Sequence, residues 1–127
     1  MEKKIVGYAR VNTPADAESS QVLEQQVERL KGKGATEIFA DIGSSTAEDR
    51  SQFNLMMVLI GAGEVQEVIV TRIDRLTRSL TQLGHFITAV ENSGANLRIL
   101  DQGLDLRTPT GKLMARLLGT VVEWERG

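Results

Sequence analysis

The chain has 127 residues, of which 41% are hydrophobic and 25% are charged, and these values are typical of one globular domain with a modest core. Its formal charge of −2 excludes a generally basic surface, so contact with nucleic acid would have to use a local patch. The sequence contains no cysteine, which excludes disulfides, thiolate catalysis and cysteine metal sites, and we expect a cytoplasmic protein. The first residues lack the apolar segment of a secretory signal, and no membrane partner is expected.

Hydrophobic periodicity predicts alternating strands and helices along the chain. In chain order we expect a strand over 5–11, a helix over 19–33, a strand over 37–40, a polar loop over 41–46, a helix around 53–60 closed by glycine, a strand over 68–70, a helix over 80–92, a strand over 96–100 and a helix from 110 onward. This alternation with short connections predicts an α/β fold, a three-layer sandwich with a mostly parallel four- to five-stranded sheet and helices on both faces.

The last predicted helix has an unusually wide apolar face. Four residues recur at helical spacing along it, Leu113, Leu117, Val121 and Trp124. Three further apolar side chains widen this stripe, at Met114, Leu118 and Val122. The stripe is broader than a surface helix needs, which favours contact with another subunit. The alternative is that the helix simply packs on its own sheet.

The segment from Val68 to Arg78 passes from a buried strand directly into a charged cluster. Val68, Ile69 and Val70 form a short β-branched run that suits a strand covered on both faces. Charged residues follow at once, namely Arg72, Asp74, Arg75 and Arg78. Ligands of open α/β sheets bind at the carboxyl ends of the strands, so this cluster lies where a site is expected.

Arginines elsewhere in the sequence fall at equivalent positions. Arg10 lies at the end of the first strand and Arg50 follows the loop after the second. Several guanidinium groups in one crevice would repel one another unless a polyanion, or carboxylates such as Asp41 and Asp74, offset them. Asp74 could equally cap a helix, orient Arg75 or take part in catalysis.

These residues also carry a resemblance. The segment 7–13, Gly-Tyr-Ala-Arg-Val-Asn-Thr, resembles the Tyr-Ala-Arg-Val-Ser-Thr opening of the serine recombinases, the resolvase and invertase family. Residues 74–78, Asp-Arg-Leu-Thr-Arg, are similar to that family's Asp-Arg-Leu-Gly-Arg box. Further similarity comes from Gln21, from Asp41 with Ser44 and Arg50, from 105–111 and from Glu-Trp-Glu-Arg at 123–126.

The resemblance implies a site-specific DNA recombinase that cleaves and rejoins DNA through a 5′-phosphoserine intermediate without metal or other cofactor. It implies that the catalytic residues are Arg10, Arg50, Asp74, Arg75 and Arg78 around the nucleophile position at Asn12. Supporting or DNA-phosphate contacts would come from Gln21, Asp41, Ser44, Arg72 and Arg126. The implied partners are the DNA phosphate backbone and further copies of the chain, as a homodimer and a synaptic homotetramer joined through the helix at 110–126.

The nucleophile position departs from the family pattern. Asn12 stands where the family has serine, and a carboxamide has no hydroxyl with which to form a phosphate ester, so we predict that this chain is inactive. Thr13 carries a hydroxyl, but adjacent residues of a strand point to opposite faces, which argues against rescue. Asn12 is either a deliberate substitution or a natural one in a non-catalytic regulatory or oligomerisation module.

The resemblance also sets expectations about the domain. It implies that residues 1–127 form the catalytic domain, that the last helix is cut short and that the family's separate DNA-binding domain is absent. We therefore predict weak, salt-sensitive binding to DNA. A phosphoester- or nucleotide-binding doubly wound domain remains the alternative from a different class, although the first strand is followed by no Gly-rich phosphate loop.

Overall fold

A computed structural model of the chain describes residues 3–11, 17–43, 50–77 and 79–126. The strands are β1 (Lys4–Val11), β2 (Glu37–Ile42), β3 (Val65–Val70), β4 (Asn96–Ile99) and β5 (Leu104–Asp105). The helices are α1 (Ala17–Gly32), α2 (Ser51–Gly61), α3 (Ile73–Leu76), α4 (Leu80–Asn92) and α5 (Pro109–Arg126). Within these described parts, no helix is both long enough and apolar enough to cross a membrane.

The five strands form one sheet in the order β2-β1-β3-β4-β5. β1 pairs in parallel with β2 and β3, β3 pairs in parallel with β4, and the short β5 returns antiparallel to β4. The predicted α/β class and mostly parallel sheet are therefore confirmed. β1 and β3 lie side by side at the centre, so the segments that follow them meet at one edge of the sheet.

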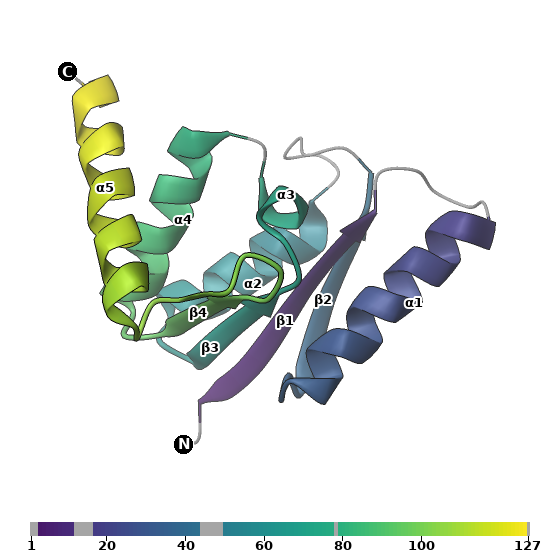
Figure 1. The fold of residues 1–127 in the computed structure, drawn as a ribbon. Helices are drawn as coiled ribbons and strands as arrows, with labels where there is room; N and C mark the ends of the chain where they lie inside the picture. Colours follow the sequence, from purple (N-terminus) through teal and green to yellow (C-terminus); the bar gives the residue numbers. More distant parts are fainter. Residues whose placement is uncertain (1–2, 12–16, 44–49, 78, 127) are drawn as a thin grey trace.

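Helices cover both faces of the sheet (Figure 1). α1 packs on one face, where Ile5 and Ala9 of β1 contact a small apolar cluster around Leu30. α2 and α4 cover the other face, where Val6 and Tyr8 of the same strand join the larger core. The alternation along β1 follows from the two-residue period of a strand, and it explains why the central strands carry few charged side chains.

Two strands extend beyond their predicted bounds by two or three residues. β2 continues to Ile42, so Asp41 belongs to a strand and pairs with Arg10 of β1 rather than lying in a loop. β3 begins at Val65, three residues earlier than predicted, because the buried Glu67 is accommodated in it. The Glu67 carboxylate accepts hydrogen bonds from Asn96 Nδ2 at 2.6 Å and Arg98 NH2 at 2.9 Å. A buried charge with partners on the neighbouring strand does not interrupt a sheet, although it interrupts the apolar run in the sequence.

α5 stands on the outer side of α4 (Figure 1). Its start is fixed by Thr108, whose hydroxyl accepts a hydrogen bond from the Gly111 N–H at 3.1 Å, and by Pro109 at the first helical position. Leu118 and Val122 are buried against α4. The wide apolar stripe predicted from the sequence is thus divided, and only part of it packs inside the domain.

Candidate functional site

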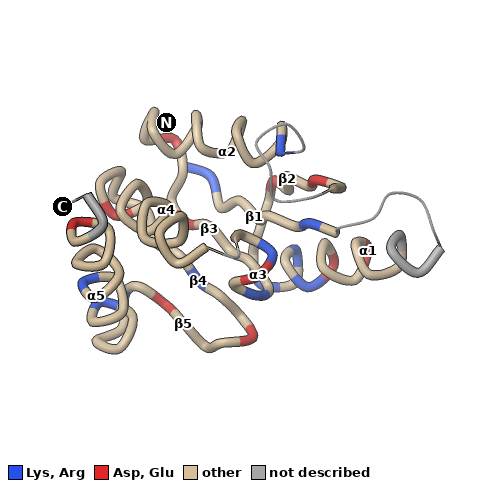
Figure 2. Tube along the Cα trace, turned by 90° about the horizontal axis from the view of Figure 1, so that it is seen from above, with Lys and Arg blue, Asp and Glu red and all other residues tan. Residues whose placement is uncertain are grey.

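The candidate site lies at the carboxyl ends of β1 and β3. Arg10 is the penultimate residue of β1, and the turn containing Arg72, Asp74 and Arg75 follows the adjacent strand β3 through the single-turn helix α3. Seen from above the sheet edge, blue segments of β1 and α3 gather together (Figure 2). Sequence positions 65 residues apart are therefore brought into contact by the parallel pairing of β1 with β3.

Arg10 is held by main-chain oxygens. Its side chain is 2% exposed. Nε donates to the Arg75 carbonyl at 3.2 Å, NH1 donates to the Gly43 carbonyl at 3.1 Å and NH2 donates to the Asp74 carbonyl at 2.9 Å. One guanidinium group therefore joins the segments that follow β2 and β3 to the end of β1, because its donors diverge in a rigid plane.

Arg75 makes the reciprocal hydrogen bond to Arg10. Its NH1 donates to the Arg10 carbonyl at 3.1 Å, so each arginine binds the main chain of the other. Its Nε is buried and has no hydrogen-bond partner among the described residues. The Arg75 side chain is thus fixed through NH1, and its Nε is a buried donor without a described acceptor.

Asp74 and Arg72 form an ion pair at the exposed rim of the cluster. Arg72 NH2 lies 3.1 Å from Asp74 Oδ2, and both side chains are about half exposed. The Asp74 carboxylate thus offsets an arginine of this turn, as predicted, and that arginine is Arg72 rather than Arg75. The Asp74 carbonyl, by contrast, is one of the acceptors that hold Arg10.

Arg50 lies in a different environment, on the α2 side of the sheet. It is 5% exposed, and its guanidinium carbon lies 3.8 Å from the centre of the Phe53 ring. Its Nε donates to the Tyr8 hydroxyl at 3.4 Å, and its NH2 has no hydrogen-bond partner among the described residues. Aromatic faces stabilise a cation without neutralising it, so Arg50 remains a buried positive charge.

Asp41 faces α2 from the end of β2. Its Oδ1 accepts from the Gln52 N–H at 3.0 Å, and its Oδ2 accepts from the Phe53 N–H at 2.9 Å and from the Tyr8 hydroxyl at 2.7 Å. It therefore caps α2 from another element, at the end of the helix dipole that favours a negative charge. Burial raises the pKa of the Tyr8 hydroxyl above its ordinary value, which keeps it protonated as a donor to this carboxylate.

One residue that the sequence did not single out supports Arg10 directly. Gln26 of α1 is buried, accepts from the Arg10 N–H at 3.2 Å and donates to the Arg10 carbonyl at 3.1 Å. The available signal was a glutamine one residue before Val27 on the apolar side of α1. Gln21, which was predicted to support the site, is exposed on the same helix.

Several predicted residues cannot be placed relative to this cluster. Asn12, Ser44 and Arg78 lie outside the described residues, as does the side chain of Arg126. Within the described part of the chain, no group of three or more histidine, aspartate and glutamate side chains is arranged to hold a metal ion.

Fold and arginine positions together define a doubly wound α/β domain with cations at the carboxyl edge of its sheet. Residues 5–127 match the model of one protein family, described as the N-terminal domain of resolvase, and the chain belongs to this family. The predicted resemblance is therefore confirmed, and with it the serine recombinase class of the domain.

Individual relatives agree with this assignment. The chain is 31% identical over 126 residues to a probable DNA-invertase, y4cG, of Sinorhizobium fredii, and 31% identical over 125 residues to the transposon Tn3 resolvase of Escherichia coli. These alignments cover 99% and 97% of the chain but 39% and 64% of the two relatives. The crystal structure of the N-terminal catalytic domain of TP901-1 integrase has the same fold, with a TM-score of 0.82 at 24% identity over 98% of this chain and 97% of that chain.

Proposed function

We propose that this chain is the catalytic domain of a site-specific DNA recombinase whose nucleophile position is occupied by Asn12. The observation that carries this proposal is the reciprocal pair of Arg10 and Arg75 at the carboxyl ends of β1 and β3, in a member of the resolvase family. Its substrate is the phosphodiester backbone of DNA, and it acts in the cytoplasm without metal or other cofactor.

The proposed reaction is an exchange of phosphate esters. A serine hydroxyl at position 12 would attack the scissile phosphorus, lose its proton and form a 5′-phosphoserine bond, while the bond to the 3′ oxygen breaks and leaves a 3′ hydroxyl. Attack by a 3′ hydroxyl of an exchanged strand reverses the step and releases the serine. Asn12 has no hydroxyl for this exchange, so the chain as written binds without cleaving.

The arginines have the chemistry that this exchange requires. Negative charge accumulates on the non-bridging phosphate oxygens in the transition state, and fixed guanidinium groups stabilise it. Arg75 supports this role because its NH1 is fixed on the Arg10 carbonyl while the residue stays partly exposed at the sheet edge. Arg10 holds the turn that carries Arg75, and Arg78 and Arg50 complete the proposed cation set.

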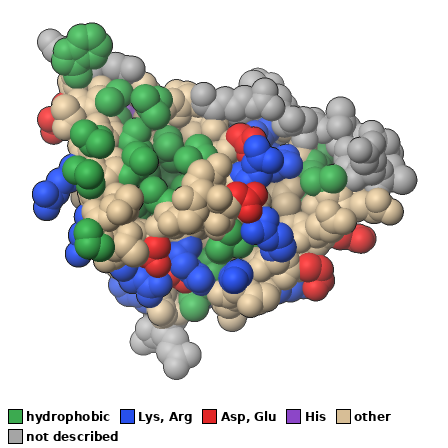
Figure 3. Space-filling view, viewed as in Figure 1, with side chains coloured by type: hydrophobic (Ala, Val, Ile, Leu, Met, Phe, Trp, Pro, Cys, Tyr) green, Lys and Arg blue, Asp and Glu red, His purple; other side chains and the backbone are tan. Residues whose placement is uncertain are grey.

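Self-association is proposed to use the outer face of α5. Leu113, Leu117 and Trp124 are 58%, 56% and 82% exposed on this helix. A space-filling view shows hydrophobic side chains gathered over the side of the molecule formed by α5 and α4 (Figure 3). An apolar face of this kind favours burial against a second copy, first as a homodimer and then in a synaptic homotetramer.

The decisive test restores the hydroxyl. The full-length product of the gene with Asn12→Ser is incubated with DNA that carries its cognate site, and covalent protein–DNA adducts are separated under denaturing conditions. We expect an adduct with Asn12→Ser and none with the asparagine protein, and the double variant with Arg75→Ala should lose the adduct again.

Two other outcomes have clear meanings. If Asn12→Ser binds the site and never forms the adduct, the proposed active site is wrong. If the asparagine protein instead inhibits or assists an active recombinase in mixed assemblies, the chain is a naturally non-catalytic regulatory module, which Asn12 also permits.

A further inference from the structure

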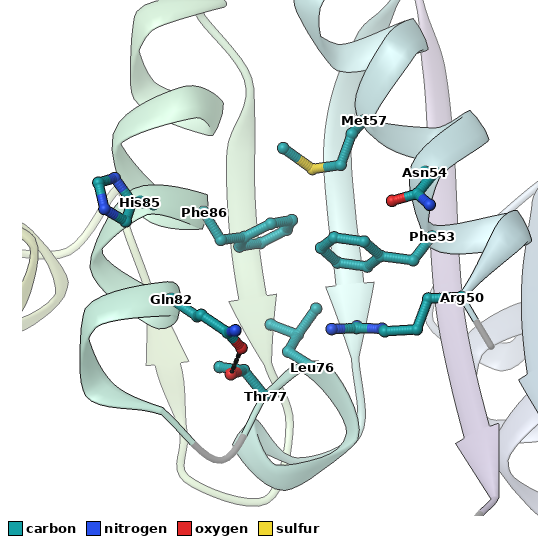
Figure 4. Close-up of a pocket in the computed structure, with 9 residues that line it drawn as sticks. All are labelled: Arg50, Phe53, Asn54, Met57, Leu76, Thr77, Gln82, His85 and Phe86. Atoms are coloured by element: carbon teal, nitrogen blue, oxygen red, sulfur yellow. Dashed lines mark hydrogen bonds between the residues drawn. The ribbon is translucent and has the colours of Figure 1, made fainter. Parts of the chain in front are cut away.

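A cavity of about 270 Å³ opens between α2 and α4, on the face of the sheet opposite α1. It is lined by Arg50, Phe53, Asn54, Met57, Leu76, Thr77, Gln82, His85 and Phe86 (Figure 4). This volume is slightly below the usual range for pockets that hold drug-sized ligands, so its natural occupant would be a small molecule.

The walls of the cavity are mostly apolar and aromatic. Phe53 and Phe86 pack against each other in its wall, with ring centres 5.8 Å apart and planes tilted by 36° (Figure 4). Met57 lies beside the two rings, and Leu76 lies opposite Met57 in the same view. An aromatic or short aliphatic group would find dispersion contacts here on several sides.

One cationic group points into this apolar space. The Arg50 guanidinium extends towards the interior of the cavity, and its NH2 is buried without a partner among the described residues (Figure 4). The Phe53 ring occupies one face of the guanidinium plane, so the remaining donor lies on its edge. An unpartnered donor on a buried charge is costly, and an anionic acceptor would remove that cost.

The polar groups of the rim do not supply this acceptor. The Thr77 hydroxyl and Gln82 Oε1 lie 2.6 Å apart and bond to each other. Asp41 accepts from Tyr8 and from the start of α2, and Arg50 reaches it through the Tyr8 hydroxyl. The described wall of the cavity therefore combines an apolar body with the buried Arg50 cation, which has one unsatisfied donor.

We propose that this cavity binds a small organic monocarboxylate, with the apolar part against the paired Phe53 and Phe86 rings and the carboxylate on the Arg50 guanidinium. A carboxylate carries one negative charge and matches one guanidinium edge in its plane. A phosphate group in the cavity would bring more charge and more acceptors than Arg50 and the apolar side chains among the described lining residues can satisfy. A second copy of the chain, inserting an apolar side chain, is the competing occupant.

This binding does not depend on the DNA chemistry proposed above. One consequence for catalysis does rest on that DNA chemistry. If Arg50 contacts the scissile phosphate, a ligand in the cavity would hold Arg50 away from the phosphate and inhibit cleavage. Binding is therefore measured without DNA, so that failure of one proposal is distinguishable from failure of the other.

The test uses two probes of nearly the same shape, the anionic 3-phenylpropionate and the neutral 3-phenylpropionamide, whose NH2 replaces one carboxylate oxygen. Each is titrated into the isotope-labelled chain, and backbone amide shifts are followed by NMR. We expect saturable shifts in α2 and α4, with the acid binding about ten-fold or more tightly than the amide because of its charge-assisted bond to Arg50.

Two variants locate the site. Arg50→Gln removes the buried cation and should abolish the difference between acid and amide, while Arg29→Gln removes one cation from the exposed α1 surface and should leave that difference unchanged. Met57→Phe places a larger group in the apolar wall and should weaken both probes by about ten-fold or more. The comparison of the two probes on the unaltered chain needs no variant and stands even if Arg50→Gln fails to fold.

Three results would overturn the proposal. One is equal affinity for acid and amide, or no saturation of the acid up to about 10 mM, above the millimolar range expected for a ligand of this size. Another is a set of backbone amide shift changes near exposed arginines instead of in α2 and α4. The third is a set of cavity shifts that follows protein concentration and that the acid does not displace, which would assign the cavity to a second copy.

Discussion

At the scale of single residues, the carboxyl edge of the sheet depends on guanidinium groups that bind main-chain carbonyls. Arg10 donates to three carbonyls from three different nitrogens, and those acceptors belong to segments far apart in the sequence. Arg10 is therefore a cation of the proposed site, and its hydrogen bonds also hold together the segments that follow β2 and β3. A lysine at this position could supply the charge but not the planar set of donors.

The first prediction concerns Arg10→Lys. We expect it to lower the free energy of unfolding by about 2–4 kcal/mol, because buried carbonyls lose charged donors and a buried ammonium is left with poor geometry. Urea unfolding measures this loss. Arg72→Lys, at the exposed ion pair with Asp74, is the control and should change stability by less than about 0.5 kcal/mol. Equal losses of stability in the two variants would contradict this structural role of Arg10.

The second prediction concerns the pH dependence set by Asp105. Hydrogen bonds from the Arg107 side chain hold the pKa of Asp105 at about 2 in the folded chain. Since the folded pKa lies below the unfolded value, the pair stabilises the fold fully above the unfolded pKa of about 3.9 and loses this effect as pH falls towards 2.

Urea midpoints at about pH 5 and about pH 2.5 test this sign. The stability advantage of the unaltered chain over Asp105→Asn should shrink at the lower pH, and Arg107→Gln should remove the same pH-dependent part. An advantage that grows on acidification would contradict the assigned cause.

At the scale of elements, the contact between α4 and α5 is set by a small residue. A Cβ atom added at Gly84 of α4 would lie 2.5 Å from Val122 Cγ2 and 3.0 Å from the Leu118 carbonyl oxygen. Leu118 and Val122 are buried on α5, so the two helices approach closely only because Gly84 has no side chain. The close packing of α5 on α4 therefore depends on Gly84.

The third prediction uses two glycines in helices. Gly84→Ala should lower the free energy of unfolding by about 1–3 kcal/mol, because α5 has to shift to relieve the overlap. Gly119→Ala on α5 is the matched control, since a Cβ there reaches no other described atom within 4 Å and the gain in helix propensity is worth up to about 1 kcal/mol. Thermal unfolding of both variants gives the comparison, and a stabilising Gly84→Ala would refute the close approach.

At the scale of the whole molecule, α5 presents two faces with different roles. Its inner face packs on α4, and its outer face leaves large apolar side chains exposed next to charged positions (Figure 3). The outer face is the part of the predicted stripe that the domain itself does not bury. We therefore expect it to govern assembly rather than the stability of the monomer.

The fourth prediction is that Leu117→Glu weakens self-association by about ten-fold or more while leaving the fold intact, because it places a charge in the centre of the outer face. Sedimentation equilibrium measures the association, and circular dichroism checks the fold. Val58→Glu on α2, which replaces a side chain that is 68% exposed, should leave association unchanged. If Val58→Glu has the larger effect, the interface lies on α2 instead.

Hydrophobic periodicity and short motifs are local signals, and they were enough to predict the α/β class, the order of the main strands and helices and the family. The short elements α3 and β5 were missed, since a single helical turn and a two-residue strand have too little periodicity to detect. Asp41 was predicted to lie in a loop because a charged residue at the end of an apolar run is typical of a loop, although it belongs to β2.

The connections within the candidate site come from contacts between segments that are distant in the sequence. Parallel pairing of β1 with β3 made Arg10 and Arg75 bind each other's main chain, and α1 brought the unpredicted Gln26 to Arg10. The tertiary fold also buries Arg50 against Phe53 and Tyr8, so Arg50 is not part of an exposed arginine patch. Residue types record which chemistry is available, but which donors are satisfied and which remain open depends on contacts between segments that no local pattern encodes.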